Sequence, residues 1–390
     1  MADGKIERKV VLVCKKNANS SLYFRSLKNA ELEVQAAEHF SDVEGLLESF
    51  GAKVVVHALE GFERNETSRF HYNMCRSPRG SELQRFMIYR SNNMRAVAFS
   101  LDVGMHKALP QERAAHTLGH AVQMMLQALQ NRDALQMQGL ALSTSGRPNY
   151  TDEEMKIVEK VFKAFPSDLM IRTAMARVCF LRGDYDQAID LARRILQSEP
   201  YAVRAMTILG EIEAKLGQHE LAMKLIIKAN ELAGGNPERL ATLARLSVDL
   251  GQYPEAKKYL LEALRLFPEF TILHSELQKI PFNGLEAKEV LELVAPKVHG
   301  EALTQLAVGL ARPVILLRQF QFVTEIVNCA VETLPETNQK CGFLYKVAEE
   351  LLGMGAKNEA VTQLRRCLEI DPQYPGAGDL LIKIKTNLAA

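Results

Sequence analysis

Short apolar runs separated by polar, turn-rich segments dominate the first third of the chain. A continuous apolar run of about four to eight residues is typical of a strand that is covered on both faces. Helical patterns lie between the first three runs, and a longer helical pattern covers residues 111–130. Alternating strands and helices predict an α/β domain with a doubly wound, five-stranded parallel sheet. The five predicted strands are residues 8–14, 32–37, 53–58, 85–89 and 95–101.

From about residue 151 the pattern becomes helical and repeats with a fixed period. Three segments align without gaps, and their turn glycines Gly183, Gly217 and Gly251 lie 34 residues apart. Small residues recur at the same interval, at Ala176, Gly210 and Ala244 and again at Ala188, Ala222 and Ala256. This period and these positions resemble the tetratricopeptide repeat (TPR).

The repeat pattern has a physical reason in helix packing. A small residue on each helix of a pair lets the two axes approach, and glycine provides the turn between them. A single pair cannot bury its apolar stripe, so neighbouring pairs must stack into a superhelix with a concave face. The resemblance therefore implies an all-α TPR superhelix after the sheet domain.

The pattern weakens toward the C-terminus and then returns. Arg318 stands where a turn glycine belongs in one degenerate copy, and Gly355 marks a clear last copy. The stretch 280–285 interrupts a helical reading, so one repeat near 270–300 is expected to be distorted. Thr151 begins a capped helix that would close the start of the superhelix, after a turn-rich segment. The predicted domains are residues 1–135 for the sheet domain, 136–150 for a linker and 151–390 for the TPR superhelix.

The rhythm of the first domain resembles the receiver domain of bacterial response regulators. The stretch 99–110 adds to this resemblance, because Lys107 falls at the place of the family's lysine after strand five. Another small flavodoxin-like domain is the alternative reading. In the receiver family, acidic residues after strand one bind Mg²⁺, and strand three ends in the aspartate that accepts a phosphoryl group.

This sequence departs from the receiver pattern at the positions that carry the chemistry. Lys15 and Lys16 follow the first strand, and His57 stands near the end of the third. Ammonium groups repel a divalent cation, and phosphoryl transfer loses its main charge stabilisation without one. Ser91 and Lys107 remain, but they do not suffice, so the resemblance implies a domain that cannot be phosphorylated. The three lysines could bind an anion or nucleotide, or they could simply be solvated.

In TPR proteins the first helix of each pair lines the groove where partners bind. The clamp that chaperone adaptors use for a C-terminal carboxylate is absent, since Arg177, Glu211 and Arg245 stand where its asparagine would be. Arginines at this spacing suit an acidic or carboxylate-bearing peptide, although they could also pair with neighbouring glutamates. The groove positions transferred from the family are Met170, Thr173, Arg177, Arg204, Thr207, Glu211, Glu238, Arg245, Arg312 and Glu349.

Composition excludes several classes of function. The 48 basic and 47 acidic side chains leave a net charge of +1, which indicates neither a nucleic-acid nor an anionic-membrane partner. Six scattered cysteines form no Cys-x-x-Cys pair and read as reduced thiols. His116 and His120 lie one helical turn apart, but no third ligand is fixed, so we expect no metal site. Phosphate-loop, nucleophile-elbow and dinucleotide motifs are absent, so we expect no cofactor.

These features together predict a non-enzymatic, cytoplasmic adaptor of bacterial signalling. A partner peptide or domain would bind in the TPR groove, and the receiver-like domain would be a second interaction module. The alternative is a switch in which an anion or nucleotide bound to the N-terminal lysines controls access to the groove. The sequence predicts no membrane span and does not indicate the oligomeric state.

Overall fold

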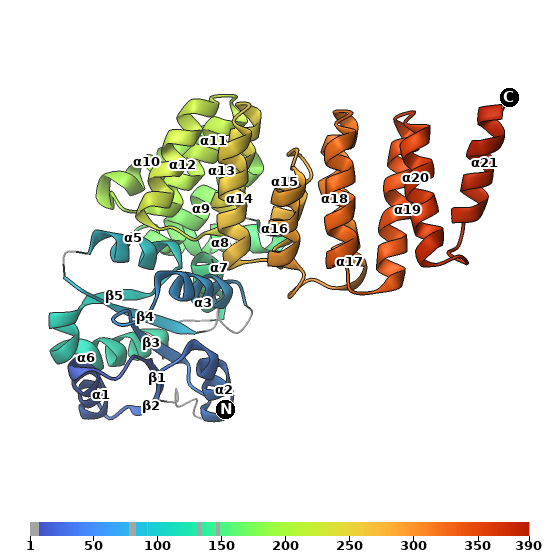
Figure 1. Cartoon of the computed structure of the whole chain (residues 1–390). Helices are drawn as coiled ribbons and strands as arrows, with labels where there is room; N and C mark the ends of the chain where they lie inside the picture. Colours follow the sequence, from blue (N-terminus) through green and yellow to red (C-terminus); the bar gives the residue numbers. More distant parts are fainter. Residues whose placement is uncertain (1–7, 78–82, 92, 131–133, 146–148, 390) are drawn as a thin grey trace. The chain divides into compact units, whose positions relative to one another are not determined.

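A computed structural model describes residues 8–77, 83–91, 93–130, 134–145 and 149–389 of the chain. These residues form two compact units, Met1–Asn236 and Pro237–Ala390, which we call the N-terminal and C-terminal units. The N-terminal unit contains the sheet domain and the first helical pairs (Figure 1). The C-terminal unit is built entirely from helices in its described residues.

The sheet has five parallel strands in the order β2-β1-β3-β4-β5, which confirms the predicted fold class. Strand β1 is the apolar segment KVVLV, and its residues from Val10 onward are buried because helices cover both faces of the sheet. The strands are β1 Lys9–Val13, β2 Glu33–Ala37, β3 Val54–Ala58, β4 Gln84–Tyr89 and β5 Lys107–Pro110.

Helices pack on both faces of this sheet. Val10 and Leu12 contribute to a core with α1 (Ala18–Asn29) and α6 (Gln111–Gln130). Val11 and Val13 point to the opposite face, where α2 (Phe40–Phe50) packs. Helix α3 (Arg64–Arg76) also covers that second face, and Figure 1 shows α3 and α6 on opposite sides of the strands.

The prediction of a fifth strand over residues 95–101 was wrong. Residues 95–101 lie within helix α5, Met94–Asp102, and β5 follows it. The side chain of Asn93 accepts a hydrogen bond from the Ala96 amide at 3.1 Å and so caps this helix. Ala96 and Phe99 are three residues apart and buried, which is helical rather than strand spacing. Lys107 consequently begins strand five instead of following it.

Residues 136–145, which the sequence predicts to be linker, are helical. Helix α7, Ala134–Ser145, packs against α8 (Asp152–Ala164) and contacts α9 (Leu169–Arg182). Its hydroxyls donate back to the preceding turn, from Ser143 to the Gly139 carbonyl at 2.7 Å and from Thr144 to Leu140 at 3.1 Å. This bonding lets a polar segment remain helical while buried. Residues 146–148 of the predicted linker lie outside the described residues.

The helical pairs follow the predicted repeats. In the N-terminal unit, Gly210 lies where a Cβ would meet Ile226 Cγ1 at 2.5 Å, so a small residue permits this close helix crossing. Gly183 and Gly217 have φ values of 82° and 78°, as the turns between helices require. The pairs are α9 Leu169–Arg182 with α10 Tyr185–Ser198, and α11 Val203–Lys215 with α12 His219–Leu232.

The C-terminal unit continues with the same kind of pair. The expected distortion is present, because α15 has only seven residues and Gln278–Asn283 separate it from α16. Arg318 adopts φ 55°, the left-handed conformation that glycine takes in the other turns. The helices are α13 Pro237–Asp249, α14 Tyr253–Leu266, α15 Thr271–Leu277, α16 Gly284–Val294, α17 Gly300–Leu316, α18 Phe320–Thr333, α19 Thr337–Gly353, α20 Lys357–Ile370 and α21 Ala377–Ala389.

Candidate functional sites

The lysines predicted to form an N-terminal basic pocket do not come together. Lys16 pairs with Glu38 at 2.8 Å beyond the end of β1. Lys15 lies 3.4 Å from His39 Nδ1 and over the ring of Phe62, 4.9 Å from its centroid. Lys107 is exposed at the start of β5, whereas Lys15 and Lys16 follow the end of β1. In the register of the sheet Lys107 is level with Leu12 of β1, but β5 lies three strands away from β1, so about 14 Å separates the two positions.

An acidic side chain holds the carboxyl edge of the sheet together. Glu60, which follows β3, accepts hydrogen bonds from Asn17 at 3.3 Å and from Asn19 and Gln111 at 3.2 Å each. Its other oxygen accepts from Arg90 at 3.1 Å. The hydrogen bonds from Asn19 and Arg90 are the main causes that lower the pKa of Glu60. Sequence reasoning missed this residue, and its place two residues after a strand was the available signal.

Ser91, predicted to keep the receiver's hydroxyl position, is hydrogen-bonded to Glu112 at the start of α6. This hydrogen bond lowers the pKa of the Glu112 carboxyl. The hydroxyl of Ser91 therefore already has an acceptor within the same domain.

His57 is a residue of β3, and its side chain is completely buried. Its Nδ1 lies 2.7 Å from Nε2 of His71 on α3, so one ring donates a hydrogen bond and the other accepts it. Aromatic rings surround the pair, with Phe40 and Phe62 centroids 5.0 and 4.9 Å from that of His57. Burial lowers the pKa of His57 to about 3 and places the pKa of His71 well below its usual range. Both imidazoles are therefore neutral near pH 7.

Two predicted groove residues of the N-terminal unit pair with each other. Arg177 on α9 forms an ion pair with Glu211 on α11, and their side chains are only 13% and 15% exposed. The Arg177 guanidinium also lies over the Phe180 ring, 5.2 Å from its centroid. This arrangement matches the alternative in which the groove arginines pair with neighbouring glutamates.

A third predicted groove residue, Arg204, is hydrogen-bonded to the main chain of α5 and α7. Its guanidinium donates to the carbonyl of Asp102 at 2.7 Å, Ser143 at 2.8 Å and Thr144 at 3.2 Å. These carbonyls lie in the last turns of α5 and α7. Arg85 on β4 donates to the same Thr144 carbonyl at 3.4 Å. The sheet domain and the second repeat are thus joined through partly buried polar contacts.

The remaining groove positions of this unit are largely enclosed. Thr173 and Thr207 are buried, and their hydroxyls donate to the Leu169 carbonyl at 2.8 Å and the Val203 carbonyl at 3.0 Å. Met170 is half-buried on the first turn of α9. Because helices α5 and α7 pack on α11 and α9, the first helices of these repeats are covered by the chain itself.

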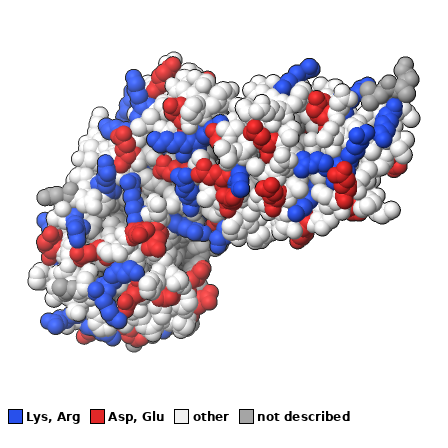
Figure 2. Space-filling view, in the orientation of Figure 1, with Lys and Arg blue, Asp and Glu red and all other residues white. Residues whose placement is uncertain are grey.

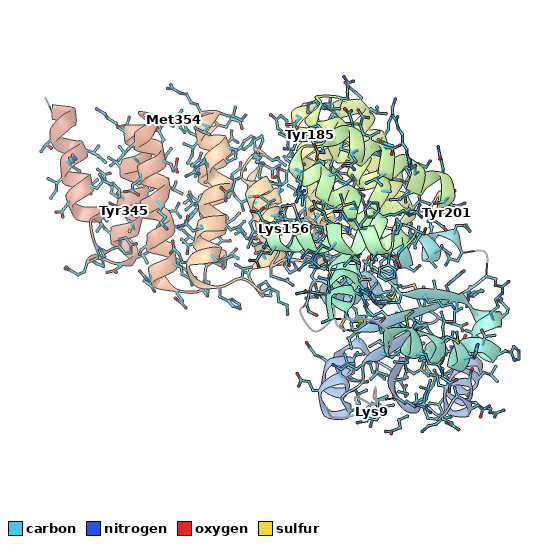
Figure 3. All side chains as sticks on the ribbon, turned by 180° about the vertical axis from the view of Figure 1, so that it is seen from behind. Lys9, Lys156, Tyr185, Tyr201, Tyr345 and Met354 are labelled. Carbon is cyan, nitrogen blue, oxygen red and sulfur yellow. The ribbon has the colours of Figure 1, made fainter. Side chains whose placement is uncertain are left out.

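The predicted positions in the C-terminal unit are more accessible. Arg245 is exposed on α13. Glu238, in the first turn of the same helix, is half-buried. Arg312 on α17 donates from Nε to Glu350 at 3.0 Å, within an exposed ion pair. Glu349 on α19 is exposed beside Tyr345, the residue labelled on this helix in Figure 3. Burial and then this carboxylate raise the pKa of Tyr345.

Charges of both signs are interspersed over the face shown in Figure 2, without a large field of one sign. Within the described residues, no group of three or more His, Cys, Asp and Glu side chains is placed to hold a metal ion. His106, close before the pair His116 and His120, accepts a hydrogen bond from the Arg85 amide at 3.1 Å. None of the described helices has the length and apolar character needed to cross a membrane.

The fold and these surfaces define a repeat protein of paired helices that carries a parallel-sheet domain. Residues 182–263 match the family model "Anaphase-promoting complex, cyclosome, subunit 3", and residues 342–374 match the model "Tetratricopeptide repeat". These two matches support the predicted TPR character of the repeats over the residues they cover. The receiver resemblance of the sheet domain stays a prediction.

Several curated proteins share part of this sequence. It is 33% identical over 101 residues to cellulose synthase operon protein C of Pseudomonas fluorescens, covering 26% of this chain and 8% of that protein. It is 25% identical over 174 residues to TPR repeat-containing protein YpiA of Bacillus subtilis, covering 44% and 40%. The chain thus spans less than half the length of the curated relatives it matches.

Solved structures resemble the chain at low identity. The crystal structure of the APC/C hetero-tetramer Cut9-Hcn1 is 18% identical with a TM-score of 0.36, covering 68% of this chain and 52% of that one. The structure of YrrB, described as a TPR protein with an unusual peptide-binding site, is 13% identical with a TM-score of 0.32, covering 57% and 96%.

Proposed function

We propose that this protein is a non-enzymatic adaptor whose repeats bind a segment of a partner protein. The observation that supports this most is that matching repeat positions are bound by the chain itself in the N-terminal unit but exposed in the C-terminal unit. Arg177 and Arg204 are engaged by the chain itself, whereas Arg245 stays exposed on the first helix of its pair. We therefore assign partner binding to the first helices of the C-terminal unit, α13, α17 and α19.

The chemistry of these helices suits an acidic or carboxylate-bearing segment. Arg245 offers a guanidinium in solvent, and a carboxylate can accept two parallel hydrogen bonds from it. Arg312 is held by Glu350 in an exposed ion pair, and such pairs contribute about 0–1 kcal/mol. A partner carboxylate can therefore replace Glu350 at small cost.

The sheet domain serves as the second interaction module in this proposal. Position 57 is a histidine instead of an aspartate, and lysines follow β1. Both features support a module that acts without phosphorylation. The resemblance to receiver domains points to a signalling protein as the partner. The alternative anion switch receives no support from the three lysines, because Lys107 lies on β5, three strands away from β1, which Lys15 and Lys16 follow.

Affinity capture from the source cell with matched variants tests the adaptor proposal. Arg245→Glu/Arg312→Glu reverses two charges on the first helices of their pairs. Lys258→Glu/Arg365→Glu makes the same charge change at exposed positions of the second helices, α14 and α20. We expect the first variant to lose about tenfold or more in affinity for the captured partner, since each charge-assisted contact contributes about 1.5–3 kcal/mol.

The second variant should bind as the wild type does, and both should keep their helical circular dichroism. Equal binding by all three proteins would show that the first helices of the C-terminal unit do not hold the partner. Loss of binding in the second variant alone would place the partner site on the second helices of the pairs.

A further inference from the structure

A cavity of about 310 Å³ opens within the N-terminal unit, between the sheet domain and the end of α12. The loop after β3, the first turns of α3 and α5, and the last residues of α12 form its walls. Its volume falls within the range of about 300–1,000 Å³ that small-molecule sites occupy. It also lies beyond the carboxyl ends of parallel strands, where ligands of α/β sheets bind.

Two arginines give this cavity its charge. Arg64 from α3 and Arg95 from α5 line it, and the other lining residues are uncharged. Within the described part of the chain, neither arginine has an ion-pair partner. This differs from Arg90, Arg177 and Arg312, each of which pairs with a glutamate. The cavity therefore carries two positive charges without a compensating carboxylate.

The polar lining is completed by hydroxyl groups at the start of α3. Thr67 and Ser68 are both buried and lie within one turn of Arg64. Ser68 makes one long contact of 3.5 Å to the Gly234 carbonyl. The positive ends of the α3 and α5 dipoles also face this region, because the cavity is lined by their first turns. These groups favour an anion at the cavity's polar end.

The rest of the wall is apolar. Leu59 and Phe62 come from the loop after β3, Phe99 from α5 and Leu232 from α12. Phe99 is only 9% exposed, so its ring lines the cavity inside the unit rather than on its surface. A ligand that fits both ends needs an apolar group attached to an anionic group.

We propose that this cavity binds a small organic anion, a carboxylate or phosphate monoester carried on an aromatic or branched aliphatic group. Arg64 and Arg95 pair with the anion, and Phe62, Phe99 and Leu232 enclose the apolar group. Because the walls come from the sheet domain and from α12, the bound ligand bridges the domain and the second repeat. This site is separate from the partner surface proposed for the C-terminal unit.

Phenyl phosphate is a suitable probe, with phenol and inorganic phosphate as its two fragments. Binding to the full chain is measured by saturation-transfer NMR for the aromatic probes and by calorimetric titration for all three. We expect phenyl phosphate to bind at least about tenfold more tightly than either fragment, because it fills both ends of the cavity. No binding of phenyl phosphate up to about 10 mM would overturn the proposal.

Variants locate the binding. Arg64→Gln/Arg95→Gln should weaken phenyl phosphate binding by about tenfold or more, since it removes both charged donors. Arg25→Gln/Arg113→Gln, at exposed positions of α1 and α6, is the matched control and should bind normally. Leu232→Trp should also weaken binding by filling the apolar end while keeping both charges. Undiminished binding in the Arg64→Gln/Arg95→Gln variant would place the anion elsewhere and overturn the assignment.

Discussion

Arg204 ends in a guanidinium that donates three hydrogen bonds to main-chain carbonyls in the last turns of two helices. Carbonyls at a helix C-terminus have no partner within the helix and carry the negative end of its dipole. A cation at this place satisfies both demands at once. Arg204 therefore holds α5 and α7 against the second repeat.

Replacing Arg204 tests this role. We expect Arg204→Gln to lower the free energy of unfolding by about 2–4 kcal/mol, because several charge-assisted hydrogen bonds to buried carbonyls are lost. Arg193→Gln changes an exposed arginine on α10 and should alter stability by about 0.5 kcal/mol or less. Urea denaturation of the two variants measures the difference. Equal midpoints would mean that Arg204 does not stabilise the N-terminal unit.

The buried pair of His57 and His71 makes stability depend on pH. The pKa of His57 is about 3 in the folded protein, whereas an unfolded histidine has a pKa of about 6.5. The unfolded chain therefore binds more protons below about pH 6.5, and folding stability decreases as the pH falls. The stability that comes from keeping these histidines neutral is fully present above that pH. It falls by about 1.4 kcal/mol per pH unit for each histidine as the pH drops toward the folded pKa.

The variant His57→Leu/His71→Leu removes both titrating rings without leaving one buried nitrogen unpaired. We expect it to lose less stability than the wild type between pH 7.5 and pH 5, as measured by urea denaturation at each pH. His120→Leu, at an exposed position of α6, is the control and should keep the wild-type slope. An unchanged slope in the double variant would contradict the assignment of this pH dependence to the pair.

At the scale of elements, the turn of the degenerate repeat is a clear case of strain. Arg318 has φ 55°, although an L-residue in this conformation costs about 1–2 kcal/mol relative to its usual helical region. The 34-residue period predicts a glycine at such turns, and Gly355 at the last copy has φ 75°. The repeat geometry therefore imposes the left-handed conformation even where the side chain opposes it.

We expect Arg318→Gly to raise the free energy of unfolding by about 0.5–1 kcal/mol, because glycine adopts this conformation without a Cβ penalty. Arg318→Ala is the matched control, since it removes the side chain but keeps the Cβ, and it should give no gain. Thermal or urea denaturation measures both. Equal stabilisation by alanine and glycine would assign the effect to the arginine side chain and not to backbone strain.

The elements differ in how far the sequence could predict them. The repeats were predictable because glycines and small residues at a fixed period are imposed by local geometry. Helix α5 was mistaken for a strand because its apolar run fits both periods, and β5 is only four residues long with Lys107 at its start. Helix α7 was mistaken for linker because its serines and threonine also suit turns, and their hydroxyl bonding back to the helix leaves no sequence signal.

At the scale of the whole molecule, the sequence predicted only some of the contacts that the proposed groove residues make. Arg177 and Glu211 are 34 residues apart, so the repeat period itself places them side by side. The carbonyls that bind Arg204 lie 102, 61 and 60 residues away in sequence, and no local pattern connects them. The same holds for Glu60, whose donors come from separate loops and helices. Long-range packing decides which predicted groove residues stay free for a partner.

Hydrogen exchange of the full chain, alone and saturated with its captured partner, tests the adaptor account most directly. We expect amides in α13, α17 and α19 to exchange about tenfold or more slowly in the complex, because a bound segment suppresses local opening of the helices it contacts. Helices α14, α18 and α20 should change little. Protection confined to those second helices, or to residues 1–236, would contradict the claim that the C-terminal repeats hold the partner on their first helices.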